Sequence, residues 1–174
     1  MLDIPGVVQW ITALVSDYLY GGVFIGAIIA TTVPVIPSEA LYPLAGFVAS
    51  QNHMSPFEVT LVGISGGAGA TVASIILYVI SLKLGRDAIL KHLRHTRVSE
   101  KHLAKAEHWF EKYGEKMVFF CRMVPVLREL ISIPAGVLGM RPIKYIIYTF
   151  SGSCIWSIGL TFFGYYFGKT IPFL

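Results

Sequence analysis

Four ionisable side chains stand inside otherwise apolar stretches of the chain: Glu39, Arg122, Arg128 and Glu129. A charge at the centre of a bilayer costs about 3 kcal/mol or more, so such residues are functional candidates by default. An arginine guanidinium stays charged and forks onto a phosphate or a carboxylate. Two arginines six positions apart, around Pro125, could therefore hold one phosphate headgroup, and a nearby carboxylate could carry a proton.

The same charges also have a purely structural interpretation. The arginines and glutamates could pair with one another and hold the local backbone in place. Glu129 adjoins Arg128, so a structural pair is a stronger alternative for Glu129 than for Arg122. We favour direct contact with a substrate or a proton, because four such charges would be costly to retain for packing alone.

The composition predicts a membrane protein of one domain. Hydrophobic residues make up 55% of the 174 residues, charged residues 14%, and the mean hydropathy is +0.66. A soluble core of this size needs less apolar surface. Cys121 and Cys154 both lie in apolar runs, which predicts buried free thiols rather than a disulfide.

Three segments are predicted to be continuous helices that contact the membrane. Residues 1–19 predict an amphipathic helix in the interface, with Trp10 and Tyr18 at the level of the headgroups. Residues 59–82 and 145–168 are free of charged side chains and long enough to span the hydrocarbon, which takes about 20 helical residues.

Two further apolar segments are interrupted by proline. In residues 20–49, Pro34 and Pro37 separate two arms that are each too short to span, and residues 117–139 are broken at Pro125. Proline removes an amide donor and breaks a helix. Broken backbone at membrane depth is tolerated only where protein or a watery cavity covers it, so each segment predicts a re-entrant hairpin.

Residues 83–116 form the polar part of the chain and carry nine of its fourteen lysines and arginines. Positive loops favour the cytosolic side, so we predict that this linker, which includes a helix ending at Gly114, is cytosolic. Topology then explains the net charge of +4 better than a nucleic-acid partner does. The linker holds four of the five histidines, but their spacing fits no zinc pattern, and we expect neither a metal nor a cofactor.

The order of the segments suggests an internal duplication. A broken segment followed by a full span occurs twice, and Glu39 precedes Gly46 by seven residues just as Glu129 precedes Gly136. The topology that the basic residues favour brings the two hairpins in from opposite faces. Inverted repeats with broken helices at the midplane are typical of transporters. The predicted fold is thus all-α, with an inverted repeat and two facing re-entrant hairpins.

These features resemble the DedA family, also called the SNARE-associated or VTT-domain family, over about residues 20–170. The resemblance rests on a set of short strings in a fixed order: Pro34-x-x-Pro37-Ser38-Glu39 with Ala45-Gly46; Leu77-Tyr78 with Gly85-Arg86; Trp109-Phe110-x-Lys112-Tyr113-Gly114; Phe120-x-Arg122-x-x-Pro125-x-x-Arg128 with Pro134-Ala135-Gly136 and Met140; and Gly152-x-x-x-Trp156 with Gly164 and Gly168.

The resemblance implies lipid transport. Family members resemble translocases of undecaprenyl phosphate or related polyprenyl phosphates, others are linked to phospholipid scrambling, and several to phenotypes that depend on the proton motive force. The family's essential arginines correspond to Arg122 and Arg128, and its acidic residue after Pro-x-x-Pro to Glu39. Two acidic positions of the family differ, because this chain has Ala30 at one, and Thr71, Ala73 and Ser74 around the other. We hypothesise that Glu129 supplies the missing second carboxylate.

We therefore expect a multi-pass transporter of the cell membrane, not an enzyme, that moves undecaprenyl or polyprenyl phosphate coupled to protons. Its partners would be an anionic lipid phosphate and protons, and the sequence leaves open whether it forms a homo-oligomer. The predicted roles are substrate binding by Arg122, Arg128, Glu39 and Ser38, proton coupling by Glu39 and Glu129, and hinge or packing functions for Pro34, Pro37, Pro125, Pro134, Gly46, Gly136 and Trp156.

Four alternatives remain open at this point. A phospholipid scramblase would share the fold and differ in not depending on a proton gradient. A proton-coupled exporter of small ions or drugs would also use intramembrane charges. A membrane enzyme acting on lipid phosphates would need a nucleophile or a metal near the arginines, whereas the histidines lie outside the apolar segments. A structural assembly factor would tolerate neutralisation of these charges.

Overall fold

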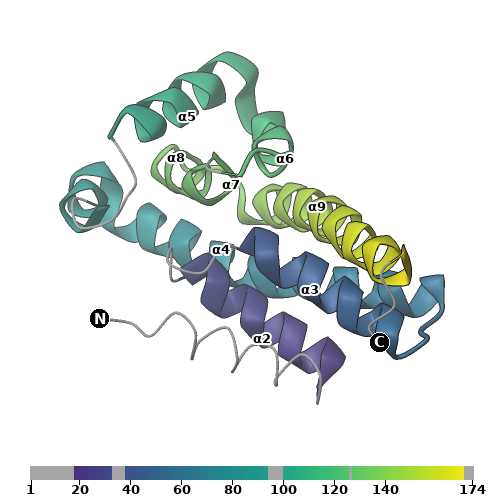
Figure 1. Cartoon of the computed structure of the whole chain (residues 1–174). Helices are drawn as coiled ribbons and strands as arrows, with labels where there is room; N and C mark the ends of the chain where they lie inside the picture. The colour runs from purple at the N-terminus through teal and green to yellow at the C-terminus, as the bar shows by residue number, and fades with distance from the viewer. Residues whose placement is uncertain (1–17, 33–37, 94–99, 126, 171–174) are drawn as a thin grey trace. The chain divides into compact units, whose positions relative to one another are not determined.

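A computed structural model describes residues 18–32, 38–93, 100–125 and 127–170, without the side chains of residues 38, 85–93, 100–103, 105–107 and 129. Every regular element in these ranges is helical, which confirms the all-α prediction for them. In chain order (Figure 1) the elements are α2 Leu19–Thr32, α3 Ser38–Gln51, α4 Pro56–Leu93, α5 Glu100–Tyr113, the short 3₁₀ turn η1 Gly114–Lys116, α6 Met117–Cys121, α7 Leu127–Leu130, α8 Ser132–Val137 and α9 Pro142–Thr170.

Two helices are long and apolar enough to cross a membrane. They are Pro56–Leu84 within α4 and Pro142–Thr170 in α9, each of 29 residues. At 1.5 Å per residue, each extends about 43 Å, more than the roughly 30 Å of the hydrocarbon core. They contain the predicted spans 59–82 and 145–168. The helix α4 continues to Leu93, past the predicted end of the span, because Lys, Leu, Arg and Ala favour helix and no proline stops it.

The backbone contacts divide the chain into two compact units. The first unit comprises residues 1–70 and 154–174, and the second comprises residues 71–153. The helices α4 and α9 each contribute one part to both units. The predicted interfacial helix of residues 1–19 lies outside the described residues, apart from residues 18 and 19, and so do Pro34 and Pro37.

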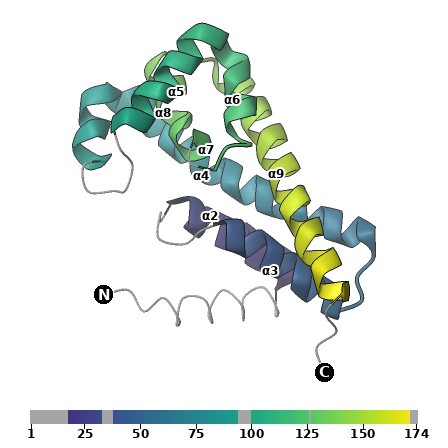
Figure 2. The same cartoon turned by 45° about the horizontal axis from the view of Figure 1, so that its top comes forward.

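In the first unit, α2 and α3 lie side by side as a helical hairpin (Figures 1 and 2). Their shared core is formed by Val23, Ala27, Ala30, Leu41, Tyr42, Ala45 and Val62. The helices α3 and α9 approach closely at two glycines, since an added Cβ would lie 1.9 Å from the Thr161 carbonyl oxygen at Gly46 and 1.9 Å from the Pro43 carbonyl oxygen at Gly164. Small residues allow such close helix packing in membranes.

In the second unit, the broken segment forms three short helices. The helices α6, α7 and α8 follow one another with a turn at Pro125, and α5 packs against all three (Figure 2). Gly114, with φ +67°, joins α5 to η1 in a left-handed backbone conformation that favours glycine, and α5 ends there as predicted. The core of the unit is formed by Tyr78, Phe110, Val118, Cys121, Leu127, Ile131, Ala135, Met140 and Tyr145.

The segment 117–139 is thus divided into short helices, with the predicted break at Pro125 between α6 and α7. Its re-entrant path through a bilayer and its relation to the α2–α3 hairpin by an inverted repeat stay predictions.

Candidate functional site

The candidate site centres on Arg122, which terminates α6. Its backbone N–H donates to the Phe119 carbonyl at 3.2 Å, and the helix ends there because the chain turns toward Pro125. The Arg122 side chain is 2% exposed. A buried guanidinium is stable only when its N–H donors find acceptors.

Arg122 donates hydrogen bonds to hydroxyl groups from three helices. Its Nη1 donates to Ser74 Oγ of α4 at 2.7 Å. Its Nη2 donates to Ser132 Oγ of α8 at 3.2 Å, to the Tyr145 hydroxyl of α9 at 3.1 Å and to Thr149 Oγ1 of α9 at 3.4 Å. Hydroxyl groups are neutral, so these four bonds orient the guanidinium without cancelling its charge.

Tyr145 ties this network together. Its hydroxyl lies 2.7 Å from Ser132 Oγ and 3.0 Å from the Ser74 carbonyl oxygen, so it donates to one of them while it accepts from Arg122. The Tyr145 ring stacks on the Tyr78 ring with centroids 4.2 Å apart and an interplanar angle of 15°. The Tyr78 hydroxyl in turn donates to the Met140 carbonyl. The aromatic pair therefore fixes the position of the hydroxyl that Arg122 contacts.

Two glycines provide the room that the network needs. At Gly152 an added Cβ would lie 2.7 Å from Arg122 Cβ and 3.0 Å from the Phe119 carbonyl oxygen. At Gly136 an added Cβ would lie 2.6 Å from both Ser81 Cβ and the Tyr78 carbonyl oxygen. These glycines let α9 approach α6 and let α8 approach α4, which brings the hydroxyl groups within reach of Arg122.

The second predicted arginine lies on the same broken segment. Arg128 is 5% exposed, belongs to α7, and its backbone N–H donates to the Val124 carbonyl at 2.9 Å. Glu129 follows it in α7, but its side chain lies outside the described part of the chain. The second unit therefore holds both arginines, with Arg122 at the end of α6 and Arg128 in α7, and their joint action on one headgroup stays a prediction.

The predicted residues of the first broken segment belong to the first unit. Glu39 is half-buried in the first turn of α3, where the positive end of the helix dipole favours a carboxylate. Ser38 begins α3, and its side chain is not described. Whether these two residues act together with the arginines stays a prediction.

The predicted hinge and packing residues differ in their surroundings. Pro125 is exposed in the turn after α6, whereas Pro134 is buried within α8. Gly46 and Gly136 are contact points between helices, as described above. Trp156 is half-buried against the core of the first unit, and its Nε1 has no hydrogen-bond partner among the described residues.

Sequence reasoning missed the hydroxyl partners of Arg122. Ser74 drew attention only because it lies in the stretch where the family resemblance implied an acidic residue, and Tyr145, Ser132 and Thr149 were not singled out. A usable signal was present, because Tyr145 and Thr149 are spaced by one helical turn inside a span without charges. Polar side chains on one face of such a span mark the side that faces a polar partner.

The chain also matches known proteins. The family model of the VTT domain matches residues 36–166, which is most of the sequence. The chain belongs to the VTT-domain family. This confirms the resemblance to the DedA proteins.

Two of the relatives carry a transporter name. Undecaprenyl phosphate transporter A of Staphylococcus aureus is 33% identical over 164 residues, covering 90% of this chain and 77% of the relative. Undecaprenyl phosphate transporter A of Bacillus subtilis is 32% identical, covering 95% and 78%. A relative from Lactococcus lactis, named alkaline phosphatase-like protein, is 32% identical, covering 88% and 73%. No solved structure matches the chain.

Proposed function

We propose that this VTT-domain protein transports undecaprenyl phosphate, or a closely related polyprenyl phosphate, across the cell membrane. The observation that carries the proposal is the buried guanidinium of Arg122. Arg122 lies in the broken helical segment, and four hydroxyl groups orient its guanidinium. The relatives named undecaprenyl phosphate transporter A, at 32–33% identity over most of both chains, support the same substrate.

A lipid phosphate suits the chemistry of this network. Guanidinium groups bind phosphate oxygens through paired, charge-assisted hydrogen bonds. The hydroxyl groups that accept hydrogen bonds from Arg122 can be replaced as acceptors. A phosphate oxygen would take the place of one of them at a modest cost in free energy, because a single hydrogen bond contributes little net stability. Arg128, buried one turn of chain beyond Pro125, would supply the second cation. The turn at Pro125 would let the two arginines move together onto a headgroup.

Coupling to protons forms the second part of the proposal. Glu39 and Glu129 are the carboxylates of the two broken segments, and a carboxylate that gains or loses a proton changes the local charge by one unit. In this mechanism protonation alternates with phosphate binding, which links lipid movement to the proton gradient. The basic linker 83–116 lies on the cytosolic side in the corresponding multi-pass topology.

Transport in proteoliposomes tests the function. The full chain is reconstituted with undecaprenyl phosphate, and appearance of the lipid in the outer leaflet is followed with and without a proton gradient. Arg122→Ala should reduce the rate at least tenfold. Arg141→Ala is the matched control, because Arg141 is an exposed arginine at the start of α9, and it should transport at the parent rate. Undiminished transport by Arg122→Ala would contradict the proposed transport function.

The same vesicles discriminate the main alternatives. Equal movement of phosphatidylcholine and undecaprenyl phosphate, unaffected by a protonophore, would indicate a scramblase. The name of the Lactococcus lactis relative makes a lipid phosphatase worth testing as well. Release of inorganic phosphate from undecaprenyl phosphate by the parent protein, abolished in Arg122→Ala, would replace transport by hydrolysis.

A further inference from the structure

A pocket lies in the second unit, at the junction of α5, η1 and α6. It has a volume of about 510 Å³ and is lined by Trp109, Tyr113, Lys116, Met117 and Phe120. Ligand pockets in proteins commonly measure about 300–1,000 Å³. Arg122 does not line this pocket, so the proposed transport mechanism does not use it.

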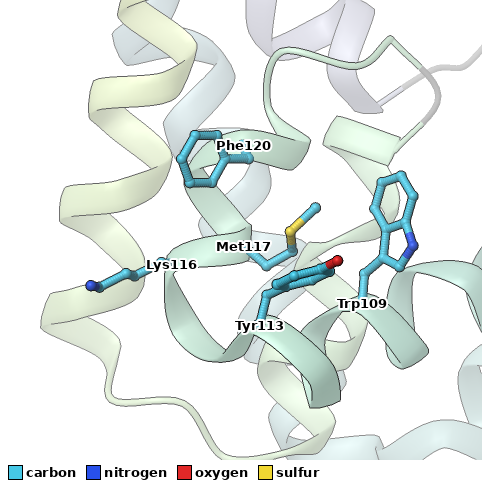
Figure 3. Close-up of a pocket in the computed structure, with 5 residues that line it drawn as sticks. All are labelled: Trp109, Tyr113, Lys116, Met117 and Phe120. Atoms are coloured by element: carbon cyan, nitrogen blue, oxygen red, sulfur yellow. The ribbon is translucent and has the colours of Figure 1, made fainter.

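Two large side chains of the pocket are exposed at the protein surface although they are mainly apolar. Tyr113 is 56% exposed and Phe120 is 57% exposed. Figure 3 shows the rings of Tyr113 and Trp109 beside Met117, with Phe120 above them and the Lys116 ammonium group extending away from this cluster at the edge. The walls therefore suit a hydrocarbon chain, and the edge carries a positive charge.

The pocket straddles the boundary between polar and apolar sequence. The basic linker ends at Lys116, and the apolar broken segment begins at Met117. Tryptophan and tyrosine gather at the level of lipid headgroups, and lysines there extend toward the phosphates. In a membrane-embedded chain, the molecule available to such a pocket is a lipid of the adjacent leaflet.

The charges near the pocket favour an anionic lipid. Lys112 lies with its Nζ 5.2 Å from the centroid of the Tyr113 ring, which is part of the pocket wall. The neighbouring carboxylate of Glu115 is held by Lys144 at 2.5 Å, and Glu111 is exposed on α5. Lys116 at the edge and Lys112 beside Tyr113 outweigh this remaining carboxylate, so a headgroup with net negative charge is attracted more than a zwitterionic one.

We propose that this pocket binds an anionic phospholipid of the cytosolic leaflet. Lys116 contacts the headgroup phosphate, and the first part of an acyl chain lies against Trp109, Met117 and Phe120. The bound lipid anchors the α5–α6 junction at the membrane surface. This site is additional to the proposed transport site and does not depend on which lipid is transported.

Quenching of Trp109 fluorescence by brominated lipids tests the proposal directly. The chain has three tryptophans, so the Trp10→Phe and Trp156→Phe variant leaves Trp109 as the only indole. Trp156 donates no hydrogen bond among the described residues, so its replacement by phenylalanine forfeits none there. This full-length variant is reconstituted in phosphatidylcholine vesicles containing increasing fractions of brominated phosphatidylglycerol or, separately, brominated phosphatidylcholine.

The expected result is quenching by both lipids, with an apparent affinity about fivefold higher for phosphatidylglycerol, because one lysine near a membrane surface contributes about 1 kcal/mol. Lys116→Gln should bring this ratio close to one. Lys169→Gln is the matched control, since Lys169 is also an exposed lysine beside a tyrosine, with its Nζ 4.4 Å from the Tyr165 ring centroid, but belongs to the first unit. It should leave the ratio unchanged.

Three results would overturn the proposal. Equal quenching by the two lipids in the parent protein would mean that the pocket does not select an anionic headgroup. A ratio that survives Lys116→Gln would remove the assigned role of Lys116. No quenching by either lipid would mean that protein, and not lipid, covers Trp109. None of these results bears on transport, which the Arg122 experiment measures separately.

Discussion

The Arg122 guanidinium donates a hydrogen bond of 2.7 Å to the Ser74 hydroxyl and thereby joins the broken segment to the first long helix. Ser74 lies in the stretch where the family resemblance led us to look for an acidic residue. In this chain a neutral acceptor contacts the arginine there, so this bond leaves the positive charge of Arg122 in place. The relationship links the strongest candidate for phosphate binding to a departure from the family pattern.

Removing the Ser74 hydroxyl should destabilise the protein measurably. Ser74→Ala takes one acceptor from a buried charged donor, which costs about 1.5–3 kcal/mol. Thermal unfolding in detergent micelles would report this as a lower Tm. Ser81→Ala is the matched control in the same helix, because the Ser81 hydroxyl donates within α4, to the Leu77 carbonyl at 2.7 Å. A Tm loss no greater than that of the control would contradict the importance of the Arg122 bond.

The Tyr145 hydroxyl should matter for transport more than the Tyr145 ring. Tyr145→Phe keeps the stacking on Tyr78 but removes an acceptor of Arg122 and a donor to Ser132 or to the Ser74 carbonyl. We expect a loss of about 1–2 kcal/mol in stability and a several-fold lower transport rate, because the guanidinium loses its fixed orientation.

Tyr166→Phe serves as the comparison, since Tyr166 is exposed on α9 and the same chemical change there should alter neither stability nor transport. If Tyr145→Phe transports at the parent rate with the parent Tm, then the hydroxyl network does not position Arg122.

A methyl group at Gly152 should disturb the site, whereas one at Gly159 should not. An added Cβ at Gly152 would lie 2.7 Å from Arg122 Cβ, while at Gly159 of the same helix it would meet nothing within 4 Å. Gly152→Ala should lower stability by about 1–3 kcal/mol through overpacking and reduce transport with it. Gly159→Ala should raise stability by up to about 1 kcal/mol, because alanine favours helix. Equal effects in the two variants would exclude a close contact at Gly152.

Replacing Glu39 and replacing Glu129 should affect the pH dependence of the transport rate differently. Under the proposed coupling, Glu39→Gln removes a proton carrier, so transport should become slow and nearly independent of the proton gradient. Glu129→Gln tests whether Glu129 is the second carboxylate and should then flatten the dependence of transport on pH. The measurement is the transport rate in proteoliposomes over a range of pH values. An unchanged pH profile in Glu129→Gln would remove Glu129 from the mechanism.

The sequence by itself was sufficient to predict the long helices and to identify the candidate charged residues. Runs of apolar residues have a length that can be compared with the thickness of a bilayer, so α4 and α9 were predictable from local pattern. The break in residues 117–139 was predictable at Pro125, although Pro43 and Pro134 each lie inside a helix. Arg122 and Arg128 stood out because charge is rare in such runs. The ordered motifs were enough to indicate the family, and the match to residues 36–166 confirms it.

Only the tertiary structure decided which groups surround Arg122. Its partners lie 48 residues away at Ser74 and 23 residues away at Tyr145, on two helices whose rotation about their axes brings those hydroxyls inward. Helical periodicity shows which side chains share a face, but the choice of a neighbouring helix depends on close packing at positions such as Gly152 and Gly136. Hydrogen bonds between distant residues follow from that packing, so they could not be inferred from spacing along the chain.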